Sequence, residues 1–280
     1  MHSINIERDR MKFDMHCHTH EGSVDSNVSV ERYIKLLMDQ GYDGMLITDH
    51  DSYDGYRYYA KHLKDDSRYK DFVVLRGVEY DTYNAGHFIV VLPSDEEPKF
   101  LEHKGLKVDT LIEAVHSAGG ILGPAHPFGE NFLSIYNTGR FKRDKSITAK
   151  FDFIEGFNSQ EDYVDNGRAV MIAKRFGKPV FSGTDSHNES NVGKATTYFD
   201  ADIRTEDDLI KYIKEGGRPQ IEGTRWYGTL KDYLGILNKT LVYGFFFYNK
   251  AGAFYRLRKR RQEFQAFLDK HNIDLLHHNK

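Results

Sequence analysis

The chain has 280 residues, of which 39% are hydrophobic and 29% charged, as in an ordinary folded protein with a sizeable core. Its formal net charge of −3 excludes a whole-chain attraction to nucleic acid or to an anionic membrane. The single cysteine, Cys17, excludes an intrachain disulfide, and no apolar run is long enough for a membrane span, so we expect a cytoplasmic protein without an obligate protein partner.

Apolar runs typical of strands alternate with helical patterns along the first two-thirds of the chain. The expected strands are 12–16, 44–48, 72–78, 87–92, 120–124, 153–157, 179–183 and 195–199. The expected helices are 29–40, 108–118, 166–176 and 206–215. Strand–helix–strand repetition favours a parallel sheet, which we expect to curl into a barrel, with an open doubly wound sheet as the alternative.

The character of the sequence changes after residue 222. Aromatic residues crowd into 243–248, and basic residues follow at 256–261. We therefore expect one α/β domain over 12–222 and a mostly helical extension over 223–280. Apolar positions recur at helical spacing in 254–268, which favours packing on the domain over a basic surface for nucleic acid or membrane.

Residue types that bind divalent metals stand at the ends of the apolar runs. His16 and His18 end the first run, and residues i and i+2 of a strand point to the same side. Asp185 and His187 repeat this spacing after the run 179–183. The other candidates at run ends are His50, Glu79, His87 and His126. Clustering of imidazoles and carboxylates at strand ends is how a barrel enzyme builds a metal site.

Each of these residues alone is explained by an ordinary polar group at a strand end. Six strand ends that all carry metal-binding residue types favour a shared site instead. Asp49 leaves three interpretations open: a ligand, a carboxylate that orients a histidine, or a helix N-cap. Glu79 has two carboxylate oxygens and is therefore able to bridge two metals, which an imidazole is not.

The ordered motifs resemble the polymerase and histidinol phosphatase (PHP) superfamily over residues 12–190. The matching motifs are His16-Cys17-His18-Thr19, Thr48-Asp49-His50, Gly77-Val78-Glu79, Ala125-His126-Pro127 and Gly183-Thr184-Asp185-Ser186-His187. This resemblance implies a distorted (β/α)7 TIM-like barrel that binds two or three divalent transition-metal ions, Mn, Fe or Zn. The implied ligand sets are His16, His18, Glu79 and Asp185 for one metal, Glu79, His87 and His126 for a second, and Asp25, His50 and His187 for a third. Asp25 is shifted relative to the family pattern, so His20 and Glu21 remain alternatives.

The resemblance also implies a reaction, the metal-dependent hydrolysis of a phosphomonoester, a nucleotide or a short oligonucleotide. A hydroxide that bridges the two metals sharing Glu79 would attack phosphorus. The implied catalytic residues are Glu79, Asp185, His50 and His187. Phosphate esters usually need a further cation. Arg76, Lys194 and Arg140 are the candidates because they lie close to the motifs, and we favour Lys194, which follows the last motif.

Two other functions fit parts of the pattern. An amidohydrolase also uses His-X-His on a barrel, but it commonly adds a bridging lysine, and no expected strand in 87–183 ends in lysine. A non-catalytic metal-binding module is the third candidate, and the nearly full ligand set speaks against it. We therefore expect a metal-dependent phosphoesterase whose partner is a small phosphorylated substrate or a short nucleic acid.

Overall fold

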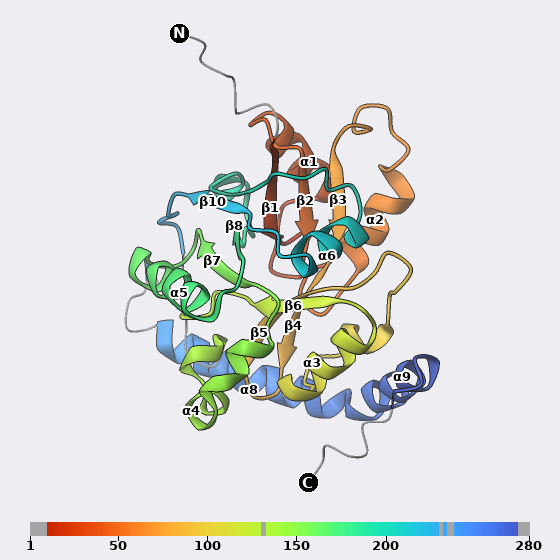
Figure 1. The fold of residues 1–280 in the computed structure, drawn as a ribbon, viewed down its shortest axis with the longest axis vertical. Helices are drawn as coiled ribbons and strands as arrows, with labels where there is room; N and C mark the ends of the chain where they lie inside the picture. Colours follow the sequence, from red (N-terminus) through yellow and green to blue (C-terminus); the bar gives the residue numbers. More distant parts are fainter. Residues whose placement is uncertain (1–9, 130–132, 230–231, 234–237, 274–280) are drawn as a thin grey trace.

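The computed structural model describes residues 10–129, 133–229, 232–233 and 238–273, which form a mixed α/β fold (Figure 1). The strands are β1 (Met11–Cys17), β2 (Gly44–Ile47), β3 (Val73–Arg76), β4 (Val78–Thr82), β5 (Gly86–Val91), β6 (Ile121–Pro124), β7 (Ile154–Asn158), β8 (Val180–Gly183), β9 (Ala195–Phe199) and β10 (Gln220–Gly223). The helices are α1 (Val30–Met38), α2 (Asp54–His62), α3 (Val108–Ser117), α4 (Gly139–Arg143), α5 (Tyr163–Phe176), α6 (Glu206–Lys214), α8 (Asn238–Tyr255) and α9 (Leu257–Lys270). Each expected range overlaps at least one of these elements, while α2, α4 and β10 were not expected.

The strands form three hydrogen-bonded sheets, ordered β10-β9-β1-β2-β3, β4-β5-β6 and β7-β8. Pairing is parallel for β1–β2, β2–β3 and β7–β8, as the alternation of strands and helices predicts. The parallel prediction is wrong for β4, β5 and β6, which pair antiparallel. β9, beyond the part of the chain for which we expected a parallel sheet, is antiparallel to β1 and β10. Only residues 83–85 connect β4 to β5, and so short a connection makes a hairpin, not a parallel crossover.

The sheets meet edge to edge through isolated bridges. His50 bridges to Glu79, and Cys17 bridges to Ser186. The expected strand 72–78 is divided at Gly77, where β3 ends in the first sheet and β4 begins in the second. The described strands do not close into a barrel, so the distorted (β/α)7 form stays a prediction.

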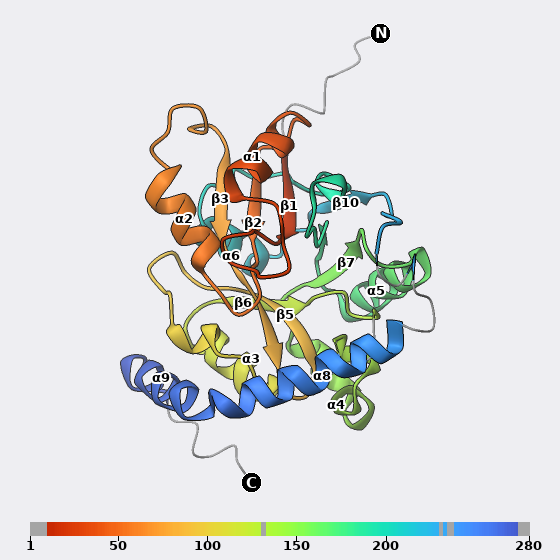
Figure 2. The same ribbon diagram turned by 180° about the vertical axis from the view of Figure 1, so that it is seen from behind.

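Helices cover both faces of the first sheet (Figures 1 and 2). Met45 and Ile47 of β2 belong to an apolar cluster with α1 and α2, whereas Leu46 belongs to a cluster with Leu209 and Ile213 of α6. This is the period-two alternation of a strand that is buried on both faces. The sheet therefore holds the ends of β1 and β2 rigidly between two layers of helices.

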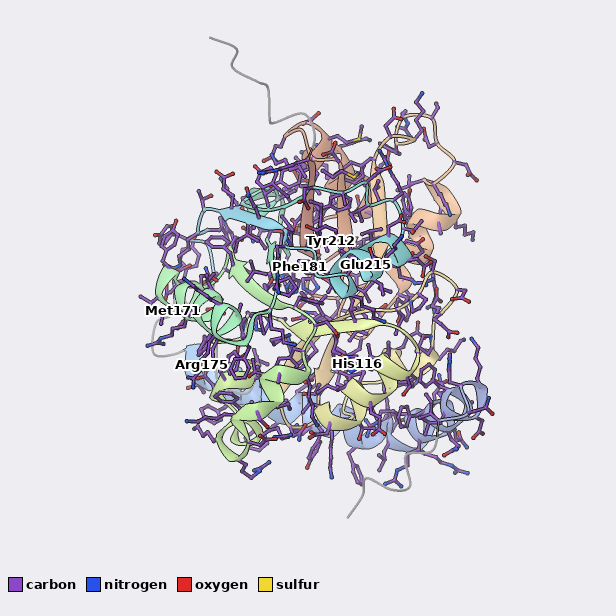
Figure 3. All side chains as sticks on the ribbon, viewed as in Figure 1. His116, Met171, Arg175, Phe181, Tyr212 and Glu215 are labelled. Carbon is purple, nitrogen blue, oxygen red and sulfur yellow. The ribbon has the colours of Figure 1, made fainter. Side chains whose placement is uncertain are left out.

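Aromatic rings connect the first sheet with the β7–β8 sheet. Phe199 packs edge-on against Phe13 at 5.6 Å and against Phe181 at 6.0 Å between ring centroids. Phe181 in turn lies 4.3 Å from Phe153, and Tyr212 of α6 packs on Phe199 at 5.5 Å (Figure 3). Such pairs contribute roughly 0.5–1.5 kcal/mol each beyond their buried area. One core thus fixes β1 relative to β8, the two strands whose ends carry the paired ligand candidates.

The long helix α8 runs beneath the β4-β5-β6 sheet, and α9 follows it (Figure 2). Phe264 and Phe267 of α9 place their rings 5.0 and 4.8 Å from Phe100 in the turn η2 (Lys99–Glu102). The apolar face of 254–268 therefore packs in part on the domain, although Phe254 is 78% exposed.

β10 ends at residue 223 and belongs to the first sheet, so a domain boundary at 222/223 stays a prediction. Within the described ranges, each helix is too short or too polar to cross a bilayer.

A capping box starts α6. Thr205 Oγ1 accepts a hydrogen bond from the Asp208 backbone N–H at 3.2 Å, and Asp208 Oδ2 accepts one from the Thr205 N–H at 2.9 Å. We expect Thr205→Ala to lower the free energy of unfolding by about 1 kcal/mol, because orphan N–H groups at the helix start lose an acceptor. Urea denaturation measures this loss. Lys211→Ala, at an exposed position of the same helix, is the control, and equal losses in the two variants would contradict the capping role.

Candidate metal centre

The nine side chains proposed from the sequence as ligands gather at one place, where β1, β4 and β5 meet the segments after β2, β6 and β8. They are His16, His18, Asp25, His50, Glu79, His87, His126, Asp185 and His187. The side chains of six are at most 13% exposed, whereas Asp25, His50 and His187 are 47%, 26% and 24% exposed. The cluster is therefore buried, and these three residues form its open side.

The first group within the cluster contains His16, His18, Glu79 and Asp185, whose donor atoms lie within 4.8 Å of one another. The Nε2 atoms of His16 and His18 are 3.1 Å apart. Asp185 Oδ1 lies 3.1 Å from His18 Nε2, and Glu79 Oε2 lies 3.4 Å from the same atom. Two imidazoles and two carboxylates thus converge on one small volume, which is a donor set that suits a divalent transition metal.

Glu79 stands at the middle because its two oxygens face different histidines. Oε1 lies 3.1 Å from His87 Nδ1 and 3.0 Å from His126 Nε2. Oε2 lies 2.9 Å from His50 Nδ1 and faces the His16–His18 pair. The carboxylate is fully buried. The two oxygens thus face different imidazoles, and the bridging of two metals by Glu79 stays a prediction.

The open side of the cluster brings Asp25 to two histidines. Asp25 Oδ2 lies 3.5 Å from the Nε2 atoms of both His50 and His187. The two alternatives to Asp25 have other partners: Glu21 accepts a hydrogen bond from the Val30 N–H, and the His20 ring lies 3.2 Å from the Ser26 carbonyl. The structure therefore places Asp25, not the alternatives, in contact with the third group.

Two of the nine residues have a left-handed backbone. His126 has φ of 27° and Asp185 has φ of 53°, a region that L-residues other than glycine rarely adopt. The Asp185 N–H donates to the His16 carbonyl at 2.8 Å, and the His126 N–H donates to Glu155. Tertiary hydrogen bonds thus hold both residues in strained conformations, as is common at functional sites.

Sequence reasoning missed Glu155 and Asn158, which lie on β7 behind the cluster. Glu155 accepts hydrogen bonds from His16 Nδ1 at 2.9 Å and from Asn158 Nδ2 at 3.2 Å. Asn158 Nδ2 also lies 3.1 Å from Asp185 Oδ2. A carboxylate behind a ligating histidine fixes the ring orientation. The sequence feature that could have revealed Glu155 is its place inside the apolar strand 153–157, where a buried charge is stable only with hydrogen-bond or ion-pair partners.

Asp49 holds the loop of residues 19–23 against β2. It accepts hydrogen bonds from the Thr19 N–H at 2.6 Å, the Thr19 hydroxyl at 2.8 Å and the Ser23 hydroxyl at 3.1 Å. Ser23 Oγ lies 3.3 Å from His18 Nδ1. Of the three interpretations, the orienting carboxylate fits these contacts, since α2 begins after Tyr53 without a side-chain cap.

Within the cluster, carboxylates and imidazoles stabilise the charged forms of one another. Burial disfavours the charged form of each group, but the carboxylates raise the pKa of His16 well above its ordinary value and that of His126 to about 9. The imidazoles hold the pKa of Glu79 and Asp185 well below their usual range despite burial. For His18, burial and the neighbouring imidazoles lower the pKa to about 4. The buried anions thus depend on a positive charge at the centre.

Buried polar atoms without a hydrogen-bond partner indicate which atoms a positive ion at the centre would contact. Glu79 Oε2 and His87 Nε2 are buried and have no hydrogen-bond partner. His50 Nδ1 approaches Glu79 Oε2 at 2.9 Å without the geometry of a hydrogen bond. Buried polar atoms without partners are costly in a folded protein. The residues present therefore fit a divalent metal, which would satisfy these atoms.

The residues proposed from the sequence to bind substrate phosphate lie apart from these contacts. Arg140 is paired with Asp109 and Asp144. The Arg76 guanidinium donates to the carbonyls of Pro93, Ser94 and Glu96, which commits it to the loop after β5. Lys194 is exposed before β9, where its carbonyl accepts from the Thr224 N–H. None of the three is brought to the nine by these bonds, and substrate binding by them stays a prediction.

The fold and the buried cluster define an α/β protein with a composite site of imidazoles and carboxylates. The sequence model of the PHP domain matches residues 14–165, more than half of the chain, and that of the PHP-associated region matches residues 164–217. The chain therefore belongs to the PHP family of metal-dependent phosphoesterases, which are hydrolases.

Several solved structures share the fold of this chain. PsfC from Pseudomonas syringae is 15% identical over 86% of this chain and 98% of its own, with a TM-score of 0.58. A two-domain protein from Bacteroides vulgatus with a predicted PHP-like metal-dependent phosphoesterase is 15% identical over 77% of this chain and 65% of its own (TM-score 0.55). The lesion-specific endonuclease Q from Pyrococcus furiosus is 18% identical over 76% of this chain and 57% of its own (TM-score 0.60). No curated protein sequence matches this chain significantly.

Proposed function

We propose that the protein hydrolyses phosphate esters with metals held by the nine clustered residues. The observation that carries this proposal is the position of Glu79, whose two oxygens face separate sets of imidazoles. His16, His18, Glu79 and Asp185 would hold one ion, Glu79, His87 and His126 a second, and Asp25, His50 and His187 a third. Histidine-rich ligation favours Mn, Fe or Zn over Mg or Ca.

The charges of the site suit an anionic substrate. Three divalent ions against the carboxylates of Glu79, Asp25 and Asp185 leave a surplus of about +3 (6 − 3), which favours a phosphate ester and its more highly charged transition state. Divalent ions, when bound, supply a Lewis acid for the phosphoryl oxygens and a lowered water pKa. Attack by a bridging hydroxide in a di- or trinuclear site stays a prediction.

The chain's own residues define the direction from which substrate approaches. His50, His187 and Asp25 are the exposed members of the cluster, so the ester enters on their side. The two imidazoles stand there next to the leaving group, and the pKa of each is raised, against burial, by its carboxylate neighbours. With a third ion bound, both imidazoles are neutral ligands, so their role toward the departing alkoxide would be to hold that ion beside it.

The substrate class that we propose is a phosphomonoester, a nucleotide or a short oligonucleotide. Relatives of the same fold include endonuclease Q in complex with a duplex that carries an abasic lesion. A metal-free structure from Chromobacterium violaceum with this fold is described as an amidohydrolase (15% identity, TM-score 0.51). The bridging position here is a glutamate, not the lysine common in amidohydrolases, which favours the phosphoesterase.

Metal analysis combined with a substrate panel tests the proposal. The purified chain is freed of metal, reloaded with Mn, Fe or Zn, and assayed with p-nitrophenyl phosphate, phosphorylated metabolites, short oligonucleotides and N-acyl amino acids. We expect bound transition metal and metal-dependent release of phosphate or nucleotide. Hydrolysis of amides alone would replace the proposal by the amidohydrolase. Metal binding without turnover on any ester would replace it by a non-catalytic module.

A further inference from the structure

Helix α8 presents aromatic side chains to solvent along one side. The exposed aromatic residues of this helix, which we call its aromatic face, are Tyr243, Phe247, Tyr248, Phe254 and Tyr255. Intervals of four and seven residues connect them, so they lie on one side of the helix. Phe247, Tyr248 and Tyr255 are 66%, 73% and 90% exposed. Exposed apolar surface of this extent usually marks a contact with a protein or a membrane.

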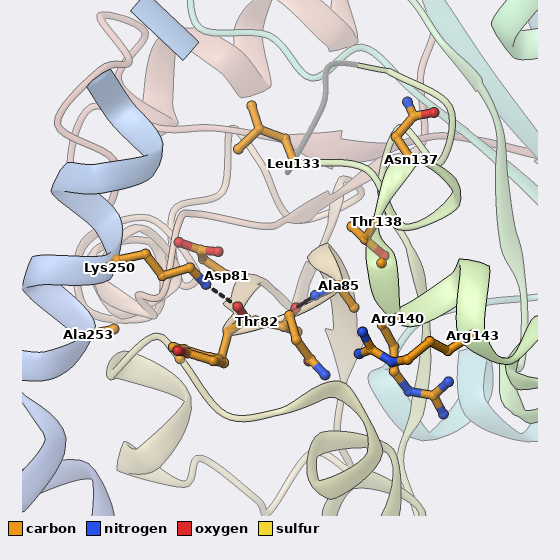
Figure 4. A pocket seen from close by; sticks show the side chains of 14 residues that line it. Asp81, Thr82, Ala85, Leu133, Asn137, Thr138, Arg140, Arg143, Lys250 and Ala253 are labelled. Atoms are coloured by element: carbon orange, nitrogen blue, oxygen red, sulfur yellow. Dashed lines mark hydrogen bonds between the residues drawn. The ribbon is translucent and has the colours of Figure 1, made fainter. Parts of the chain in front are cut away.

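Another side of α8 packs on the domain. Lys250 and Ala253 line a cavity of about 270 Å³ that lies between α8 and the β4–β5 hairpin (Figure 4). The Lys250 ammonium lies 4.0 Å from the centroid of the Tyr83 ring and donates to the Tyr83 carbonyl. Lys250 is the only charged residue of the sequence 243–255. Because this one cation is turned toward the hairpin, the aromatic face carries no charge.

Exposed basic residues follow the aromatic face at the turn into α9. They are Arg256, Arg258, Lys259 and Arg261, which we call the basic cluster. Lys259 Nζ lies 3.9 Å from Glu263 Oε1, whereas no carboxylate of the described ranges forms an ion pair with the three arginines. Arg260 is buried and donates to the Ala253 carbonyl at 3.2 Å, so it does not belong to the cluster. In a chain of net charge −3, the cluster is a local excess of positive charge.

The order of rings and cations decides which partner fits this surface. The aromatic face extends over about 18 Å of the helix axis without a charge, and the cations stand at its end. Single-stranded nucleic acid needs cations beside the stacking rings, because its phosphates recur at every nucleotide. A helix that lies on an anionic membrane instead inserts an uncharged face between the headgroups and keeps its cations near the lipid phosphates. The segregation seen here fits the membrane, where phenol rings are also favourable.

We propose that α8 and the start of α9 bind the surface of a membrane that contains anionic lipids. The aromatic face enters the region between headgroups and acyl chains, and the basic cluster contacts lipid phosphates. The helix lies along the interface, so the α/β domain stays in water beside it. This inference goes beyond the proposed function and does not depend on it, because none of these residues belongs to the nine of the metal cluster.

Flotation with lipid vesicles tests the contact on the Mn-loaded full chain. Vesicles of phosphatidylglycerol and phosphatidylcholine in equal parts are compared with vesicles of phosphatidylcholine alone. We expect at least about tenfold tighter binding to the anionic vesicles, because several cations face the lipid phosphates. This preference should decrease at about 1 M salt, where the Debye length is about 3 Å. Equal binding to both kinds of vesicle, or binding to neither, would overturn the proposal.

Charge variants locate the contact. Arg258→Gln combined with Arg261→Gln is expected to weaken binding to the anionic vesicles by about tenfold or more. Arg168→Gln combined with Arg175→Gln removes the same two charges from exposed positions of α5 and should bind as the wild type does (Figure 3). Equal losses in the two pairs would contradict a site on α8 and α9.

Tryptophan fluorescence reports whether the aromatic face enters the membrane. The chain has one tryptophan, Trp226, whose emission in the wild type is the baseline. Phe247→Trp should add emission that brominated lipids quench, whereas the added emission of Met171→Trp, at an exposed position of α5, should not be quenched (Figure 3). Vesicle binding without quenching in Phe247→Trp would overturn the insertion of this face.

Two other occupants of the surface would be recognised by their own measurements. Binding of a single-stranded oligonucleotide that the Arg258→Gln and Arg261→Gln pair abolishes, without vesicle binding, would replace the membrane by nucleic acid. A dimer in sedimentation experiments that Phe247→Ser dissociates would replace it by a second copy of the chain. Hydrolysis of a soluble phosphate ester should be unchanged in all these variants. Its absence in the wild type would refute the proposed function and leave the membrane contact in place.

Discussion

Glu79→Gln is expected to lower kcat/KM for phosphate esters by at least about 1,000-fold and to deplete bound metal. The amide keeps the shape of the side chain but loses the negative charge and one of two acceptor oxygens. Both oxygens are in use, since Oε1 faces His87 and His126 and Oε2 faces His50. Loss of the shared carboxylate therefore weakens two groups of ligands together. Excess metal should not restore activity, because no other group replaces the missing charge.

Elemental analysis and steady-state kinetics measure this effect. Glu215→Gln is the control, because it makes the same chemical change at an exposed position after α6 (Figure 3). A folded Glu79→Gln protein with wild-type metal content and turnover would refute the proposed function. Circular dichroism of the variant distinguishes loss of the site from loss of the fold.

The gathering of the side chains was largely predictable because most of their carriers lie at strand ends, although Asp25 lies in the loop between β1 and α1. Apolar runs identify strands, and strand ends of one domain tend to meet, so residues such as His16, His126 and Asp185 were expected to come together. The sequence pattern did not specify by which strands and turns each side chain reaches the cluster. Glu79 reaches the cluster from β4, which Gly77 separates from β3, and His87 reaches it through a hairpin. An apolar run shows that a strand exists, but it does not show where a bend moves the chain from one sheet to another.

Helix α2 was not predicted because its sequence lacks an apolar stripe. Only Gly55 and Tyr59 are buried in it. Gly55 is required by a close approach: a Cβ there would lie 2.1 Å from Asp49 Oδ2 and 2.2 Å from Thr19 Oγ1. The glycine that lowers helix propensity thus makes room for the hydrogen bonds that support the metal centre. At Gly55, low helix propensity opposes the helix, whereas the close approach of Asp49 and Thr19 requires a residue without a Cβ. The helix forms because the tertiary contacts outweigh the local propensity.

Substrate contacts were harder to infer than ligands. Arg76 was chosen for its closeness to Glu79 in sequence, yet Arg76 ends β3 whereas Glu79 lies on β4 in another sheet, and the Arg76 guanidinium binds loop carbonyls. Proximity in sequence predicts ligands at strand ends because the backbone places them. It does not predict where the end of a long side chain finds its partners.

Glu155→Gln is expected to weaken metal binding by about 10–100-fold, the range for a carboxylate that orients a ligating histidine. Because a carboxylate only accepts, its contact at 2.9 Å implies that His16 Nδ1 carries a proton, which leaves Nε2 as the nitrogen that would bind a metal. The same carboxylate accepts the N–H of His126, whose backbone is strained. A glutamine opposes one of these donors with another donor, so the ring or the backbone must shift.

The contrast with Glu79→Gln makes the positioning role of Glu155 testable. Activity of Glu155→Gln should fall at limiting Mn and recover when Mn is in excess, because every ligand of the centre is still present. Metal titrations by calorimetry and activity assays at several Mn concentrations measure the two quantities. The recovery follows from where Glu155 lies: it touches the ligands His16 and His126, whereas Glu79 would touch the metals. Wild-type affinity in this variant, or a loss that excess Mn leaves unchanged, would show that Glu155 does not act through His16.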